Sequence, residues 1–167
     1  MKIALAILGI LLLLVVIVLT IGYSLPVQHQ ASREATYAVS PDSVFAVITD
    51  FERLPTWRPS VKRVERVTSS GDTVQFREIG DDGAILYAVD EQRPPTRLVM
   101  RIADRSLPFG GKWTYELRPA SGGTTLRITE DGEVYNPLFR FMSKFVFTHH
   151  RTIDTYLRDL GARLSAG

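Results

Sequence analysis

The feature that most constrains the fold of this chain is the apolar periodicity of its C-terminal segment, residues 136–162. Asn136 can cap a helix there, and Pro137 suits the first helical position, where its missing N–H costs nothing. The period of three to four residues predicts one long helix with a wide apolar face. The apolar positions are Leu138, Met142, Phe145, Val146, His149, Ile153, Tyr156, Leu157, Leu160 and Leu164, and the opposite side carries Arg140, Lys144, Arg151, Asp154 and Arg158. We expect this face to lie across a curved antiparallel sheet.

Between residues 61 and 131 the apolar period changes to two. Alternating runs at 61–68, 73–79, 84–91, 97–103, 112–118 and 124–131 are separated by turns such as 69–72 and 120–123, most of them rich in glycine. Regularly spaced strands with such turns predict an antiparallel meander. Upstream, residues 34–39 suit a first strand, Ser40 and Pro41 begin a helix, and a shorter helical turn follows at 51–54. The order strand, two helices, six strands and long helix predicts the α+β class.

A second apolar segment lies at the start of the chain. Residues 3–21 carry no charge and would cover about 28 Å as a helix, close to the roughly 30 Å hydrocarbon core of a bilayer. We predict a transmembrane anchor at 1–24, a linker at 25–32 and a folded domain at 33–165. A cleaved secretory signal is the alternative, although its apolar core is usually shorter. Lys2 favours a cytoplasmic N-terminus, which would place the domain on the outer, periplasmic side.

Composition removes several classes of function. The chain carries 20 Lys and Arg against 18 Asp and Glu, and it has no cysteine. This near balance, without a basic block, does not suit nucleic-acid binding. The missing cysteines exclude disulfides, zinc–thiolate sites and cysteine nucleophiles. The sequence has no nucleotide-binding loop, zinc-protease motif or serine-hydrolase motif, so we expect no cofactor.

The histidines do not predict a metal site. His29 falls in the predicted linker, and the neighbours His149 and His150 would point about 100° apart on a helix. His150 and Asp154 share a helix face, but two ligands are too few for a metal. His149 lies on the apolar stripe, where it suits either a packed residue at a pocket rim or a polar group inside the pocket.

Three segments of the chain resemble the START-like or SRPBCC superfamily, which includes polyketide cyclases, pollen allergens and lipid-transfer domains. They are residues 37–57, which contain Ser-Pro-Asp-Ser-Val-Phe and Asp-Phe-Glu-Arg-Leu-Pro-Thr-Trp, residues 111–117, Gly-Lys-Trp-Thr-Tyr-Glu-Leu, and the terminal helix. The resemblance implies the helix-grip fold, a seven-stranded antiparallel sheet wrapped around the long C-terminal helix with an apolar cavity between them. The superfamily contains binding proteins, transporters, cyclases and hydrolases, so the fold does not fix the activity.

Inward-facing positions of the predicted elements give a candidate ligand-binding lining. Its members are Trp57, Phe76, Met100, Ile102, Trp113, Tyr115, Met142, Phe145, Val146 and His149. These residues suit a pocket and a plain core equally. Leu107, Pro108 and Phe109 form an apolar tip in the loop 104–111, with Gly110 and Gly111 as a hinge. We interpret the tip as a pocket lid or a contact with a membrane or partner, unless Phe109 tucks back onto the sheet.

No complete catalytic set is visible in the sequence. Glu130 has the parity of the apolar positions in its strand, so it can point inward, where burial would raise its pKa and suit it to acid–base chemistry. The alternative, which we prefer, is a frayed strand end where Glu130 meets solvent or an arginine. Tyr115 and His149 are further candidates and Glu78 is a weaker one, but no oxyanion hole is predicted.

Three functions remain open at this point. The first is a membrane-anchored domain that binds an apolar small molecule or lipid, because a tether beside a bilayer raises the effective concentration of such ligands. The second is an enzyme of the cyclase or dehydrase type that acts in the same cavity. The third is a partner-binding domain with a filled core.

Overall fold

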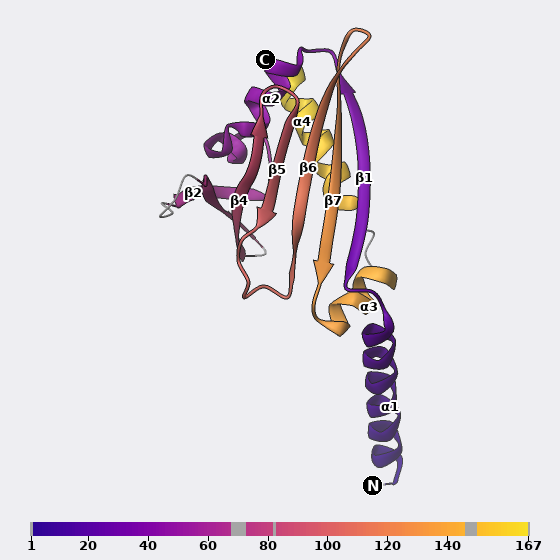
Figure 1. Ribbon diagram of the computed structural model, residues 1–167. Coiled ribbons are helices and arrows are strands. Elements are labelled where there is room, and N and C mark those ends of the chain that lie inside the picture. The colour runs from indigo at the N-terminus through magenta and orange to yellow at the C-terminus, as the bar shows by residue number, and fades with distance from the viewer. Residues whose placement is uncertain (1, 68–72, 82, 146–149, 167) are drawn as a thin grey trace.

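The computed structural model of the chain describes residues 2–67, 73–81, 83–145 and 150–166. Their elements, in order, are α1 (Lys2–Ser24), β1 (Gln28–Tyr37), α2 (Pro41–Thr49), the 3₁₀ helix η1 (Phe51–Thr56), β2 (Val61–Val67), β3 (Gln75–Gly80), β4 (Gly83–Arg93), β5 (Arg97–Ile102), β6 (Phe109–Ala120), β7 (Gly123–Val134), α3 (Pro137–Phe145) and α4 (Arg151–Ser165). Figure 1 shows α4 behind the sheet and α1 extending away from one end of it. The α+β class is confirmed.

The predicted seven-stranded antiparallel sheet is also confirmed, with strand order β1-β7-β6-β5-β4-β3-β2. The last six strands form a meander, and β1 pairs with β7 along its whole length. β1 begins at Gln28, opposite Glu133, and not at Glu34 as predicted. Residues 28–32 are therefore strand and not linker, because β7 continues far enough to pair with them. The predicted turn 69–72 lies outside the described residues.

Local sequence signals explain the first helices. The Ser40 hydroxyl accepts a hydrogen bond from the Ser43 backbone N–H at 3.2 Å, which caps α2 as expected from a Ser-Pro start. Val44, Phe45 and Ile48 are buried on one face of α2. η1 follows at once, and its only buried residue is Leu54. Both elements form part of the core at the end of the sheet remote from α1 (Figure 1).

The prediction of one long C-terminal helix is wrong, because the structure has two helices here. α4 has the expected pattern: Ile153, Tyr156, Leu157 and Leu160 are buried against the sheet. The Tyr37 hydroxyl on β1 donates to the Leu157 carbonyl at 2.8 Å, which ties α4 to the sheet edge. The predicted positions Val146 and His149 lie outside the described residues.

α3 begins as predicted but faces differently. The Asn136 side chain caps it by accepting from the Leu138 backbone N–H at 2.9 Å. Arg140, expected on the solvent side, is buried at 8% exposure. Its guanidinium donates to the Leu25 carbonyl at 2.8 Å, where it satisfies an orphan carbonyl just beyond the end of α1. This contact turns Arg140 toward the protein, whereas Lys144 remains exposed.

α1 is the one helix of the described chain that is long and apolar enough to cross a membrane, and a signal sequence has the same properties. Of its residues only Gly22 is buried. A Cβ atom at Gly22 would collide with the Pro137 carbonyl oxygen. The close approach that this glycine permits lets the end of α1 pack directly against the start of α3.

Candidate functional site

A cavity of about 470 Å³ lies between the inner face of the sheet and the two C-terminal helices. Strands β4 to β7 supply its wall on one side, and Phe139, Met142 and Ser143 of α3 with Thr152 of α4 close the other. Aliphatic and aromatic side chains dominate the wall, and the polar side chains are few. The volume falls within the usual range for small-molecule sites, about 300–1,000 Å³.

The structure brings together part of the predicted lining. Met100, Ile102, Trp113 and Met142 line the cavity, as do Pro108 and Phe109 of the predicted lid. Met100, Ile102 and Trp113 lie there because alternate side chains of a strand point to the same face of the sheet. Leu107, the remaining lid residue, is not part of the wall.

Other predicted lining residues lie elsewhere. Trp57, Phe76 and Tyr115 are buried in the core beyond the cavity, where Trp57 and Tyr115 pack on Tyr156 with ring centroids 5.3 and 5.6 Å apart. Phe145 does not reach the cavity, because α3 presents it outward at 60% exposure. Val146 and His149 fall outside the described residues, so His149 has no described role.

Glu130 does line the cavity, and it has a neighbour that the sequence did not indicate. His29 of β1 also lines the cavity, and its Nε2 lies 3.8 Å from the Glu130 carboxylate. The imidazole occupies the space above Gly132, which a Cβ atom would fill. Burial lowers the pKa of His29 below its ordinary value. His29 was missed from the sequence because this residue was assigned to a linker. His29 lies two residues before the buried Ala31, and this spacing places both side chains on the inner face of the sheet.

A buried ion pair lies behind the cavity wall. The Arg58 guanidinium donates to the Glu78 carboxylate at 2.8 Å, and it stacks 5.1 Å from the Tyr156 ring centroid. Burial raises the pKa of Glu78, and Arg58 offsets part of that rise. The pair adjoins the cavity through Tyr87, which lines it and whose pKa is raised by burial and by Glu78. Arg58 was not predicted as a partner for Glu78.

The tyrosines near this pair retain their phenolic protons. Burial raises the pKa of Tyr115 well above its ordinary value, and the pKa of Tyr156 is raised for the same reason. Tyr115 therefore remains protonated at neutral pH and is separated from the cavity by the residues of its wall. Trp57 adds a buried indole N–H with no hydrogen-bond partner among the described residues.

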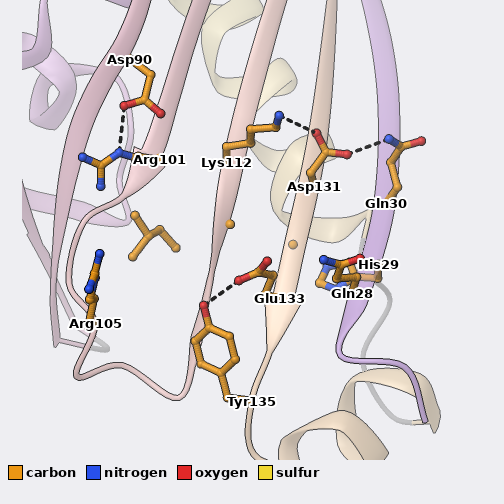
Figure 2. Close-up of a pocket in the computed structure, with 13 residues that line it drawn as sticks. Gln28, His29, Gln30, Asp90, Arg101, Arg105, Lys112, Asp131, Glu133 and Tyr135 are labelled. Atoms are coloured by element: carbon orange, nitrogen blue, oxygen red, sulfur yellow. Dashed lines mark hydrogen bonds and ion pairs between the residues drawn. The ribbon is translucent and has the colours of Figure 1, made fainter.

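A second recess, of about 860 Å³, is lined mainly by residues on the outer side of the sheet (Figure 2), and it shares His29, Ile102, Gly111 and Glu133 with the inner cavity. Four of its charged side chains form two ion pairs: Arg101 with Asp90 at 2.8 Å, and Lys112 with Asp131 at 3.9 Å. Gln30 also donates to Asp131 at 2.7 Å. The two charges within each pair cancel, so the recess has no strong charge of one sign to select a ligand. The apolar cavity on the inner face is the better candidate.

The described residues include no cluster of three or more histidine, aspartate or glutamate side chains able to hold a metal ion. The wall of the cavity is mainly apolar and offers a ligand apolar contacts. The cavity also offers one acid–base pair at its wall, formed by His29 and Glu130.

Comparison with known proteins gives one family and many solved structures. Residues 28–164 match the family model described as polyketide cyclase / dehydrase and lipid transport. None of the curated proteins matches the chain. The START superfamily protein from Mycobacterium smegmatis is 18% identical, with 83% of this chain and 98% of that chain covered, at a TM-score of 0.65.

Two further solved structures have the same fold. The protein TTHA0849 from Thermus thermophilus is 18% identical, with 83% of this chain and 98% of that chain covered, at a TM-score of 0.69. The di-domain ARO/CYC StfQ from the steffimycin biosynthetic pathway is 14% identical, with 84% of this chain and 52% of that chain covered, at a TM-score of 0.63. At these identities the likeness shows the fold and not the ligand.

Proposed function

Because this chain belongs to the family described as polyketide cyclase / dehydrase and lipid transport, we propose that it binds an apolar, lipid-like molecule beside a membrane. The cavity of about 470 Å³ carries this proposal, since its wall is mainly apolar. Its volume suits a ligand of small-molecule or single-chain lipid size. A filled core, which the partner-binding alternative requires, would leave no such space.

The proposal includes α1 as a retained membrane anchor. α1 has 23 residues and reaches about 35 Å, enough to cross the roughly 30 Å hydrocarbon core. Its end is part of the folded structure, because Gly22 packs on Pro137 and Arg140 binds the Leu25 carbonyl. Cleavage near Ser24 would remove the Gly22 contact and would leave Leu25 at the new end of the chain, which favours retention over a cleaved signal.

Membrane retention and sidedness can be tested in one experiment, because the chain has no cysteine. Ser121 lies in the exposed turn between β6 and β7, and Ser121→Cys provides a single label site there. We expect a membrane-impermeant maleimide to label this variant in intact cells with the outer membrane permeabilised, and the chain to have its full mass. Labelling only after lysis would reverse the sidedness, and a shortened mass would identify α1 as a signal sequence.

Binding is tested with two neighbouring residues of β5 whose side chains lie on opposite faces of the sheet. Ile102 lines the inner cavity, and Arg101 lies on the outer face. We expect Ile102→Trp to fill the cavity and weaken binding of a dansyl-labelled fatty acid by at least about tenfold, roughly 1.4 kcal/mol. Arg101→Trp should leave the affinity unchanged. Equal affinities in detergent for both variants and the unmodified chain would contradict the assignment of this cavity.

A cyclase- or dehydrase-type activity is the second candidate, and the His29–Glu130 pair favours it. A carboxylate 3.8 Å from a histidine at an apolar wall is placed for proton transfer to or from a bound molecule. Glu130→Gln would then lower turnover by about 10²-fold or more while leaving binding in place. Binding that survives this change without any detectable turnover in the unmodified chain would favour the carrier over the enzyme.

A further inference from the structure

α3 has the opposite arrangement to that of a helix on a water-soluble protein. It buries its cation Arg140, while Leu138, Phe139 and Phe145 are 47%, 51% and 60% exposed. Tyr135, two residues before the helix, is also exposed. Soluble proteins rarely expose a contiguous apolar patch of this kind without a partner. The question is therefore what covers this patch, which we define as Leu138, Phe139 and Phe145.

The contact with α1 sets the position of this patch. The Pro137 carbonyl packs against Gly22, two residues before α1 ends at Ser24. When α1 crosses a bilayer, Gly22 lies at the level of the interface, because about 20 residues fill the hydrocarbon core. α3, which begins at Pro137, is held at the same level. Figure 1 shows α3 beside the C-terminal end of α1, at the end of the sheet from which α1 extends.

The mouth of the cavity lies at the same level. Phe109 and Phe139 line the cavity and are also exposed, so they form its rim. Phe139 belongs to the α3 patch, and Phe109 begins β6 at the end of the sheet near α3. The rim and the patch are therefore one continuous apolar surface around the cavity opening.

We propose that α3 lies in the surface of the bilayer that holds α1, so that the cavity opens into the lipid phase and takes its ligand from the membrane. This inference rests on the proposed binding function and identifies where the ligand comes from. The charge of α3 is compatible with this position: it has no acidic residue, and Lys144 is exposed on the side of the helix that carries Arg140, away from the patch. Helices that lie in a membrane surface combine an apolar face with basic residues that bind lipid headgroups.

The depth of α3 can be measured with spin labels, because the chain has no cysteine of its own. Phe139→Cys and Phe145→Cys report the patch, and Ser121→Cys is the control in the turn at the other end of β6, roughly 40 Å away. Each labelled full-length chain is reconstituted in vesicles of phosphatidylcholine with phosphatidylglycerol. We expect labels at 139 and 145 to collide with oxygen more than with a water-soluble nickel chelate, and the label at 121 to do the reverse.

Two results would overturn the inference. One is equal nickel accessibility at all three sites, which would place α3 in water. The other is strong dipolar broadening between labels at 139 or 145 that disappears on dilution with unlabelled chain, which would identify a second copy as the occupant of the patch. Ligand binding in detergent is measured independently of the position of α3. A chain that binds the ligand in detergent but fails these spin-label tests would contradict only the membrane position of α3, not the binding function.

The route of the ligand is tested with variants that leave the cavity wall intact. Leu138 and Phe145 belong to the patch but do not line the cavity. We expect the double variant Leu138→Asp/Phe145→Asp to slow transfer of a dansyl-labelled fatty acid from vesicles by at least about tenfold. The transfer is monitored by energy transfer from tryptophan to the dansyl group, and Trp113 lies at the cavity wall. Affinity in detergent should be unchanged, and Val74→Asp, at an exposed position outside the patch, should transfer normally. An unchanged transfer rate in the double variant would contradict entry through the bilayer.

Discussion

The two C-terminal helices, α3 and α4, have the same apolar period and opposite surroundings. In α4 the apolar face, including Ile153 and Leu160, is buried on the sheet, and the charged Arg158 is exposed. In α3 Leu138, Phe139 and Phe145 are exposed and Arg140 is buried. Periodicity therefore identifies a helix face that avoids water but does not say what covers it. In α4 the cover is the sheet, and in our proposal for α3 it is lipid.

The comparison predicts its largest difference when one apolar side chain is removed from each helix. Leu160 is fully buried and Phe145 is 60% exposed. Leu160→Ala should lower the free energy of unfolding by about 3 kcal/mol, because it loses apolar burial and leaves a cavity. Phe145→Ala should change it by less than about 0.5 kcal/mol in detergent. Urea unfolding of both variants measures the difference, and equal losses would mean that α3 is part of the core.

The attachment of α3 to α1 can be broken at a single glycine. A Cβ atom at Gly22 would collide with the Pro137 carbonyl, whereas Gly9 has nothing within 4 Å. Gly22→Val should weaken the packing of α3 on α1 by up to about 3 kcal/mol. Amide hydrogen exchange in α3 should then become faster, and Gly9→Val should leave it unchanged. Unaltered exchange in the Gly22 variant would show that this contact does not hold α3.

Arg140 provides a smaller effect at the same junction. Its guanidinium donates to the Leu25 carbonyl, and Lys144 on the same helix is exposed. Arg140→Met should cost about 1.5 kcal/mol, because the carbonyl loses a charged donor. Lys144→Met should cost less than about 0.5 kcal/mol. Thermal unfolding of the two variants separates a buried capping role for Arg140 from a general effect of positive charge.

The smallest predicted effect concerns His29, at the α3 end of the cavity. Burial lowers its pKa below the ordinary value of 6.5, so between these two values the unfolded chain binds the proton more readily. The free energy of unfolding should therefore fall as the pH drops below 6.5 and through the pKa of the folded state. His29→Gln should reduce this acid sensitivity. A titration of His29 by NMR that gave a pKa above 6.5 would reverse the sign.

Much of the fold could be predicted from the sequence. Alternation and turn residues indicated the six-stranded meander, and Ser40 with Pro41 indicated the start of α2. β1 was placed six residues too late because residues 28–33 contain only one buried apolar side chain, the small Ala31, and are otherwise polar. The edge pairing with β7 that defines its start is a long-range property, which local pattern does not contain.

The site was less predictable than the fold. Parity placed Met100, Ile102 and Trp113 on the inner face, but it did not distinguish a cavity wall from the deeper core that contains Tyr115 and Phe76. The pairing of His29 with Glu130 depends on the β1–β7 register. Orientation of α3 depends on Arg140 and Leu25, which are far apart in the sequence.

The central claim is that the space beneath the C-terminal helices holds an apolar guest. Native mass spectrometry of the full-length chain, extracted from membranes in mild detergent, tests this most directly. We predict a bound mass of lipid size that persists in Arg101→Trp and is lost in Ile102→Trp. A bare chain mass in every sample, with no uptake of added fatty acid, would contradict the account.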